Sequence, residues 1–182
     1  RVGIVGLGGN GRRLAKLLAP FRTRLQAVDY YPVDRPPEVE ALWGREELLK
    51  LASQSDILIL AVPLNQQTAG MIDGRVFEAM PSGSYFINVA RGGCVDEAAL
   101  IESLQRGHLA GAGLDVTAVE PLPVDSPLWS LPNVIITPHV GAQAAHRVDD
   151  STRLACANLQ RYFQHRPLMN IVDKRLGFPH PS

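Results

Sequence analysis

The chain has 182 residues and is 46% hydrophobic, which is enough to bury a full core and predicts one domain with a tail. Its 18 basic residues balance 18 acidic residues, and no basic run occurs, which argues against a nucleic-acid or membrane-surface role and favours a small-molecule partner. The two cysteines, Cys94 and Cys156, lie far apart and outside any CxxC pattern, so they predict a reducing compartment and no bound metal.

The start of the chain has no signal-peptide pattern, and no apolar run reaches the roughly 18 residues of a membrane span. We therefore expect a soluble, cytoplasmic protein that does not enter a membrane. The first residue is Arg1, which lies directly inside a strand pattern and does not follow a methionine. From this we expect a domain cut from a longer polypeptide.

A glycine-rich turn follows the first predicted strand. Residues Val2–Val5 form a short apolar run that leads into GLGGNG and then into a predicted helix, which Pro20 helps to stop. In such a turn Gly6 permits the tight bend, Gly8 lets the backbone approach a pyrophosphate, and Gly11 allows close helix–strand packing. The predicted apolar face of the helix carries Leu14, Leu17, Leu18 and Phe21. Because a helix N-terminus also attracts anions, the segment predicts a dinucleotide site.

An acid, Asp29, follows the predicted strand 25–28 and lies 18 residues after Gly11. A carboxylate there accepts hydrogen bonds from the adenosine ribose hydroxyls and repels a 2′-phosphate, so it favours NAD over NADP. The alternative is that Asp29 only begins the turn before Tyr30, Tyr31 and Pro32.

The rest of the chain alternates predicted strands and helices. A Pro-rich surface loop is expected at residues 33–37. Further strands are expected at residues 57–63, 85–89, 110–116 and 133–137, and helices at 45–52, 74–80, 96–106 and 143–165. The run 57–63 is continuously apolar, as in a strand that is buried on both faces. We therefore predict an α/β fold with a doubly wound parallel sheet of six or seven strands and helices on both faces.

Four polar side chains lie at or beyond the ends of the later strands. Arg91 follows the strand 85–89, Asp115 and Glu120 lie at and beyond the end of 110–116, and His139 follows 133–137. Carboxyl ends of parallel strands meet at one edge of a sheet, which is where ligands bind. An imidazolium can donate a proton to a carbonyl oxygen that gains charge, a neighbouring carboxylate favours the charged imidazole, and a guanidinium can hold a substrate carboxylate.

Each of these residues also has a simpler interpretation. His139 could be a packed or capped histidine, Arg91 a surface cation and Glu120 a solvated loop acid. Cys94 lies between a Gly-Gly turn and the start of a helix. Its thiol could have a lowered pKa there, or it could be a small side chain that fills space, and we favour the second interpretation. The expected position of the first three on one edge of the sheet favours a catalytic role.

The motifs GLGGNG with Asp29, VARGGCVDEAAL, GAGLDV, EPLP and TPHVGA, in this order, resemble the NAD-binding domain of the D-isomer-specific 2-hydroxyacid dehydrogenases. The resemblance implies a Rossmann-type fold and a catalytic set of Arg91, Glu120 and His139. It also implies that Asp115 holds the nicotinamide carboxamide. The expected cofactor-binding residues are Gly6, Gly8, Asn10, Gly11, Asp29, Val62, Pro63, Thr68, Ala90, Asp115, His139 and Gly141.

The resemblance further implies NAD-dependent hydride transfer between a D-2-hydroxy acid and a 2-keto acid, in a homodimer formed through this domain. It implies that residues 1–165 are the NAD-binding domain with its long crossover helix, and that 166–182 return to a substrate domain largely missing from this chain. Alone, the chain should bind NAD with little turnover. Two alternatives remain open: an NAD(H)-sensing binding protein similar to corepressors of this fold, and a formate- or phosphite-type dehydrogenase.

Overall fold

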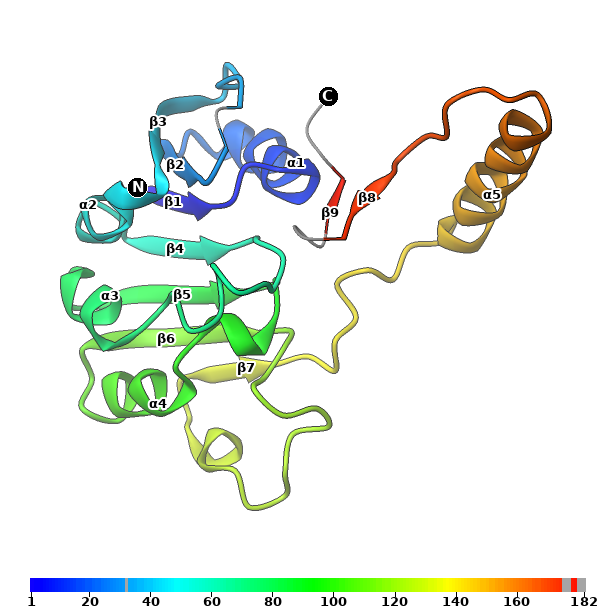
Figure 1. The fold of residues 1–182 in the computed structure, drawn as a ribbon. Helices are drawn as coiled ribbons and strands as arrows, with labels where there is room; N and C mark the ends of the chain where they lie inside the picture. Colours follow the sequence, from blue (N-terminus) through cyan, green and yellow to red (C-terminus); the bar gives the residue numbers. More distant parts are fainter. Residues whose placement is uncertain (32, 175–177, 180–182) are drawn as a thin grey trace. The chain divides into compact units, whose positions relative to one another are not determined.

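The computed structural model describes residues 1–31, 33–174 and 178–179, and the chain divides into two units, 1–138 and 139–182. The first unit is built on a seven-stranded parallel sheet in the order β3-β2-β1-β4-β5-β6-β7 (Figure 1). Its strands are β1 Val2–Val5, β2 Leu25–Asp29, β3 Val39–Gly44, β4 Ile57–Leu60, β5 Ser84–Asn88, β6 Leu109–Leu114 and β7 Val134–Ile136. The order reverses at β1, which pairs with both β2 and β4. A doubly wound sheet of this kind binds ligands at that reversal, beyond the carboxyl ends of the strands.

Among the described residues of this unit, four α-helices and four short 3-10 helices connect the strands. The α-helices are α1 Gly9–Leu18, α2 Leu48–Ser53, α3 Gly74–Ala79 and α4 Glu97–Gln105. The 3-10 helices are η1 Ala19–Phe21, η2 Arg45–Glu47, η3 Gly92–Cys94 and η4 Pro127–Ser130. The second unit contains α5 Arg147–Phe163 and a short antiparallel pair, β8 Val172–Asp173 and β9 Phe178–Pro179.

Strand β4 shows why helices cover both faces of the sheet. Its residues alternate between two apolar clusters, with Leu58 and Leu60 in one and Ile57 and Ile59 in the other. The first cluster includes side chains from α2, α3 and α4, whereas the second includes side chains from α1. Successive side chains of a strand point to opposite faces, so a continuous apolar run is what a doubly covered strand requires. The predicted doubly wound parallel fold is confirmed.

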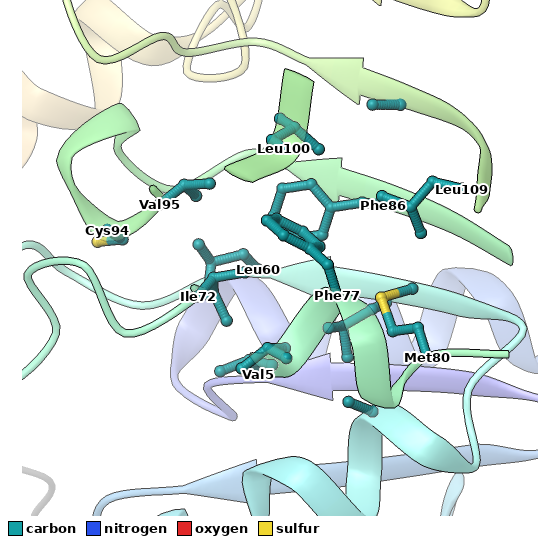
Figure 2. Close-up of a cluster of buried hydrophobic side chains, with 14 of the residues drawn as sticks. Val5, Leu60, Ile72, Phe77, Met80, Phe86, Cys94, Val95, Leu100 and Leu109 are labelled. Atoms are coloured by element: carbon teal, nitrogen blue, oxygen red, sulfur yellow. The ribbon is translucent and has the colours of Figure 1, made fainter. Parts of the chain in front are cut away.

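The larger cluster is centred on two aromatic rings between α3 and β5. Phe77 and Phe86 meet edge to face (Figure 2). Their ring centroids are 5.3 Å apart and their planes make an angle of 82°. Both side chains are at most 1% exposed, and Leu60, Ile72 and Leu100 pack around them. Edge-to-face rings add about 0.5–1.5 kcal/mol beyond the burial of their area. This packing joins α3 to the sheet at the middle of β5.

Helix α1 differs from its predicted packing. Gly11 and Ala15 are its buried residues, whereas Leu17 is 53% exposed and Phe21, in the following 3-10 turn, is 77% exposed. Because the glycine turn lies close to β1, the small residues Gly11 and Ala15 face the sheet. The predicted apolar face is therefore wrong for Leu17 and Phe21. Leu14 and Leu18 are partly buried against the sheet as expected.

Strand β3 was not among the predicted elements. Its sequence VEALWG lies at the edge of the sheet, pairs only with β2, and is mostly half-buried, so it lacks the continuous apolar run of a central strand. The long helix is present but shorter than predicted. It begins at Arg147 and not at 143, because Val140 and Ala144 accept turn hydrogen bonds from Gln143 and Arg147.

Part of the α1 face of the sheet carries exposed apolar side chains. Tyr85 on β5 is 49% exposed and Ile135 on β7 is 73% exposed. On the neighbouring strand β6, Gly111 pairs with Tyr85 and Gly113 pairs with Ile135. These glycines have no side chains to cover the surface between Tyr85 and Ile135. Within the described residues no helix is long and apolar enough to cross a membrane.

Candidate nucleotide-binding and catalytic site

The glycine turn between β1 and α1 has the geometry of a phosphate cradle. Gly6 has φ +97°, and a Cβ there would lie 2.7 Å from the Val62 side chain. A Cβ on Gly11 would lie 2.0 Å from the Gly6 carbonyl oxygen, so only glycine lets α1 start this close to the strand. A Cβ on Gly8 would meet nothing within 4 Å, so the turn is open on that side. The turn therefore leaves room for a ligand at its outer edge.

The first turn of α1 faces this opening with its backbone N–H groups. Gly8 is the N-cap, and none of the described side chains caps the helix or places an acid in its first turn. Asn10 is exposed there. Uncapped N–H groups and the positive end of the helix dipole favour a negatively charged ligand such as a pyrophosphate.

Asp29 ends β2 beside the glycine turn. Its carboxylate accepts the backbone N–H of Leu7 at 2.5 Å and that of Tyr31 at 3.0 Å. The two hydrogen bonds fix the orientation of the carboxylate, while each oxygen keeps a second lone pair for a ligand hydroxyl. The structure thus brings Asp29 together with the glycine turn, as the spacing predicted.

A hollow opens beside Asp29 at the carboxyl ends of β1, β2 and β4. Its lining consists of Val5, Gly6, Val28, Asp29, Tyr30, Arg45, Val62, Gln67, Thr68 and Met71. Most of this surface is aliphatic, with one acid and one cation at its edge. A hollow of this composition suits a flat, mostly apolar group attached to a polar one, which describes an adenosine moiety. The glycine turn, helix terminus, acid and hollow together fit a dinucleotide.

Thr68 organises the loop after β4. It is 8% exposed, and its hydroxyl donates to the Pro63 carbonyl oxygen at 2.6 Å and accepts from the Asn65 N–H at 2.9 Å. Further along, the Gly70 N–H donates to the Gly93 carbonyl oxygen at 3.0 Å. The loop after β4 is therefore tied to the turn that follows β5, and the two strand ends share one edge of the sheet.

A buried amide shapes the turn that carries Arg91. Asn88 is 1% exposed; its side chain accepts the Ala90 N–H at 3.0 Å and donates to the Arg91 carbonyl oxygen at 3.2 Å. The Arg91 side chain is exposed and donates to the Ala90 carbonyl oxygen at 2.6 Å. A guanidinium has five N–H donors, so Arg91 retains donors for a carboxylate. Asn88 was not among the predicted site residues, although its place at the end of a strand before ARGG was a usable signal.

Gly92 brings the Arg91 turn against the loop after β6. A Cβ on Gly92 would lie 1.8 Å from the Thr117 carbonyl oxygen, so the two backbones touch. In that loop the exposed Glu120 accepts the Thr117 N–H at 3.2 Å. Glu97, at the start of α4, accepts the Ala118 N–H at 2.8 Å and joins the same loop to the helix. The segments of Arg91 and Glu120 are therefore neighbours, as expected for residues that follow the carboxyl ends of parallel strands.

Asp115 follows β6 and is 9% exposed. Its backbone N–H donates to the Asn88 carbonyl oxygen at 3.0 Å, and its carboxylate accepts the Thr137 hydroxyl at 2.5 Å. The Thr137 N–H also donates to the Leu114 carbonyl oxygen at 2.9 Å. Asp115 therefore joins the ends of β5, β6 and β7.

His139 and Gly141 belong to the second unit, which begins at His139. His139 has left-handed backbone torsions with φ +53°, and the Val140 carbonyl oxygen accepts the Gln143 N–H at 2.8 Å. The structure brings Arg91, Glu120 and Asp115 to one edge of the first unit. The grouping of His139 with them remains a prediction from the sequence.

Cys94 is fully buried and makes up part of the large apolar cluster (Figure 2). Burial raises the pKa of its thiol, and the hydrogen bond with Thr68 and the charge of Arg91 oppose that rise only in part. The thiol is therefore a space-filling group, and the alternative of a lowered pKa is wrong. Within the described residues no group of three or more His, Cys, Asp and Glu side chains could hold a metal ion.

The family described as "D-isomer specific 2-hydroxyacid dehydrogenase, NAD binding domain" matches residues 1–141. This chain belongs to that family. The predicted family resemblance is thereby confirmed, and residues 1–141 are an NAD(P)-binding domain of the D-isomer-specific 2-hydroxyacid dehydrogenases.

Named relatives agree with the family assignment. A glyoxylate/hydroxypyruvate reductase A of Salmonella typhi is 36% identical over 179 residues, which is 97% of this chain and 56% of that protein. A D-isomer-specific 2-hydroxyacid dehydrogenase from Xanthobacter autotrophicus Py2, solved in complex with NADPH and MES, superposes with a TM-score of 0.91 at 39% identity, covering 98% of this chain and 56% of that one. The chain thus spans little more than half the length of these relatives.

A further solved dehydrogenase of the family extends the comparison. An NADPH-dependent glyoxylate/hydroxypyruvate reductase from Sinorhizobium meliloti, in complex with NADP and sulfate, has a TM-score of 0.86 at 32% identity, over 97% of this chain and 56% of that one. Both of these solved relatives were therefore crystallised with NADPH or NADP, the cofactor forms that carry a 2′-phosphate.

Proposed function

We propose that the chain binds NAD(H) and forms the cofactor half of an oxidoreductase that interconverts a D-2-hydroxy acid and a 2-keto acid. The observation that carries the proposal is the open glycine turn with Asp29 fixed beside it at the end of β2. The family match supports the cofactor class and the reaction class. The substrate side would come from polypeptide that the relatives have and this chain lacks.

The preference for NAD over NADP rests on the charge of Asp29. Its carboxylate lies where the adenosine ribose would be held, and a second negative group there would be repelled. The relatives from Xanthobacter and Sinorhizobium were solved with NADPH and NADP, so this chain should differ from them in cofactor choice. Asp29 is the residue that we propose sets that difference.

The catalytic proposal gives one role to each charged residue. The nicotinamide, when bound, supplies or accepts the hydride at C4. Arg91, with guanidinium donors beyond the one bound to Ala90, would hold the substrate carboxylate and polarise the carbonyl. His139 would exchange the proton with the substrate oxygen, and Glu120 would favour and orient the charged imidazole. Asp115, buried beside Thr137, would hold the carboxamide of the nicotinamide.

The role of His139 in this proposal is supported by its place in the sequence. Thr137 makes hydrogen bonds to Leu114 and Asp115 at the carboxyl end of β6, and His139 follows it by two residues. Two residues of extended chain span at most about 7 Å. We propose His139 as the proton-exchanging residue and Gly141 as a cofactor-binding residue from the order of the sequence motifs.

The first test is a fluorescence titration of the 182-residue chain with NADH and, in parallel, NADPH. We expect saturable binding of NADH and at least ten-fold weaker binding of NADPH. The Asp29→Ser variant should narrow that difference, whereas Asp34→Ser, an exposed acid in the next loop, should leave it unchanged. Absence of NADH binding to the folded chain would overturn the proposed cofactor site.

The second test concerns catalysis in the full-length polypeptide. Glyoxylate, hydroxypyruvate and pyruvate are offered with NADH while its absorbance is followed. His139→Ala should remove most of kcat, and Arg91→Ala should chiefly lower kcat/KM, with the exposed His165→Ala as the matched control. Near wild-type rates in both variants would defeat the assignment. NADH binding without turnover of any keto acid would favour an NAD(H)-sensing binding protein.

A further inference from the structure

Glu97 reaches from helix α4 to the loop that follows β6. It is the first residue of the helix and is half-buried. Its Oε2 atom accepts the Ala118 N–H at 2.8 Å. The helix does not need this carboxylate as a cap, because Asp96 is the N-cap and accepts the Ala99 N–H at 3.1 Å. The side chain of Glu97 is therefore available to hold the loop.

The peptide unit between Thr117 and Ala118 is contacted on both of its polar sides. Its carbonyl oxygen lies against Gly92, where a Cβ would come within 1.8 Å of it. Its N–H donates to Glu97. A peptide unit is planar, so contacts at the carbonyl oxygen and at the N–H together restrict its rotation. The turn that contains Gly92 and the first residue of α4 therefore set the orientation of this unit.

The orientation of that unit affects where the Glu120 carboxylate lies. The N–H of Thr117, on the other side of its Cα atom, donates to the Glu120 carboxylate at 3.2 Å. The Thr117 hydroxyl donates to the Val119 carbonyl oxygen at 2.8 Å. These two hydrogen bonds lie within the loop, so they shape it without attaching it to another element. The contact with Glu97 comes from outside the loop and attaches it to a helix.

Stability of the fold gives little reason for the Glu97 contact. Ala118 is exposed, so water could accept its N–H if the carboxylate were absent. Exchanging one hydrogen bond for another in this way changes stability little. A displacement of about 1 Å in a group that takes part in a reaction can, by contrast, reduce the rate about 100-fold. The position of the loop is therefore more sensitive to Glu97 than the fold is.

We propose that Glu97 is a positioning residue for Glu120, because it holds the peptide unit between Thr117 and Ala118 on which the place of the Glu120 carboxylate depends. This inference rests on the proposed function, in which Glu120 favours and orients a charged imidazole, and it adds a residue that acts through Glu120. The property that matters is the reach of the Glu97 side chain and not its charge, since the Ala118 N–H requires an acceptor at that distance.

Two substitutions at Glu97 separate reach from charge. Glu97→Gln keeps an acceptor oxygen at the same distance and loses the charge. Glu97→Asp keeps a negative charge, which suits the N-terminus of α4, but its shorter side chain does not reach the Ala118 N–H. Glu97→Ala removes both properties. The matched control is Glu102→Ala, which removes an exposed glutamate from the same helix.

The experiment measures the reduction of glyoxylate, hydroxypyruvate or pyruvate by NADH in the full-length polypeptide, from about pH 5 to about pH 9. Loss of the contact should lower kcat/KM by about 5- to 50-fold in Glu97→Asp and Glu97→Ala. It should also move the alkaline fall of kcat/KM to lower pH, because a displaced Glu120 supports the charged imidazole less well. Arg91 and Asp115, which also carry charge at this edge of the sheet, are the same in every variant.

The conservative variant and the control should behave differently. Glu97→Gln should stay within about three-fold of the wild-type kcat/KM and keep its pH profile, because the hydrogen bond to Ala118 remains. Glu102→Ala should match the wild type in both. A titration of the 182-residue chain with NADH should give the same affinity for all variants, since Glu97 lies far along the chain from the glycine turn.

The outcomes separate this inference from the proposed function. A wild-type polypeptide that reduces no keto acid would overturn the proposed function itself. Wild-type turnover with unchanged kcat/KM and pH profile in Glu97→Asp and Glu97→Ala would overturn only the role of Glu97. An equal loss in Glu97→Gln would show that charge matters and would contradict the inference as well. Circular dichroism shows whether each variant is folded, and Glu97→Asp decides the question should Glu97→Ala fail to fold.

Discussion

The side chain of Asn88 bonds to the backbone on both sides of the Ala90–Arg91 peptide unit, accepting from the Ala90 N–H and donating to the Arg91 carbonyl oxygen. Because Asn88 is 1% exposed, water cannot replace these hydrogen bonds. Asn88 therefore sets the direction in which the Arg91 segment leaves the sheet, although Asn88 itself need not contact a substrate.

Replacement of this amide should cost both stability and the geometry of the Arg91 turn. Asn88→Ala leaves the Ala90 N–H without its partner, whereas the Arg91 carbonyl oxygen keeps the hydrogen bond from the Cys94 N–H. We therefore expect the free energy of unfolding to fall by about 1–3 kcal/mol. Urea denaturation measures the change. Gln105→Ala, an exposed position on α4, is the control and should change stability by less than about 0.5 kcal/mol. Equal effects of the two substitutions would show that the Asn88 contacts contribute little.

A methyl group at Gly92 should separate the two loops that carry Arg91 and Glu120. The new Cβ would lie 1.8 Å from the Thr117 carbonyl oxygen, which is backbone and cannot rotate away. We expect Gly92→Ala to lower the unfolding free energy by about 1–3 kcal/mol. In Gly74→Ala the nearest atom to the Cβ is 3.8 Å away, at the first residue of α3. That control should be neutral or stabilising by about 0.4–1 kcal/mol, because alanine restricts the unfolded chain.

The N-cap of α3 should make stability depend on pH. Asp73 accepts the N–H groups of Arg75 and Val76, and the hydrogen bond from the Arg75 side chain is the main reason that its pKa lies below the ordinary value. A lowered folded pKa stabilises the fold above the unfolded pKa of about 3.9, and this contribution is lost as the pH falls through the folded pKa.

Asp73→Asn tests this dependence, since asparagine caps a helix without titrating. Between pH 7 and about pH 3, the urea midpoint of the wild type should fall further than that of Asp73→Asn. Asp56, whose pKa is lowered chiefly by the Arg1 side chain, contributes equally to both proteins and cancels in the comparison. Parallel pH profiles would contradict the prediction.

The two cysteines should differ in reactivity. Cys94 is buried and its thiol pKa is raised, whereas Cys156 is exposed on α5. The thiolate is the reactive form, so Ellman's reagent at about pH 8 should label one thiol quickly in the native chain and the second only after urea is added. In Cys156→Ser the fast reaction should disappear. Two equally fast thiols in the native wild type would show that Cys94 is reached without unfolding.

Much of the first unit could be predicted because its signals are local. The central strand β4 is a continuous apolar run, Gly6 and Gly11 mark a turn that excludes side chains, and Asp29 ends the next strand. These local patterns were enough to predict a doubly wound parallel sheet and the glycine turn, whereas the order of the strands was not predicted.

The parts that were missed depend on long-range contacts. Strand β3 is recognised only by its pairing with β2, and Arg45 enters the hollow because of that pairing. Leu17 and Phe21 had the right spacing for a buried face, but the close fit of Gly11 on Gly6 turns Ala15 inward in their place. Asn88 acts through two backbone groups that a turn brings within its reach, and spacing alone does not reveal such contacts.

The exposed Tyr85 and Ile135 side chains, with the two glycines of β6 between them, affect how the isolated chain can be assayed. Dyes such as anilinonaphthalene sulfonate become fluorescent on exposed apolar surface, and this surface is present while the sheet is intact. The folded chain should therefore give a high dye signal before heating begins. Melting curves for this protein are better followed by circular dichroism or intrinsic fluorescence than by dye binding.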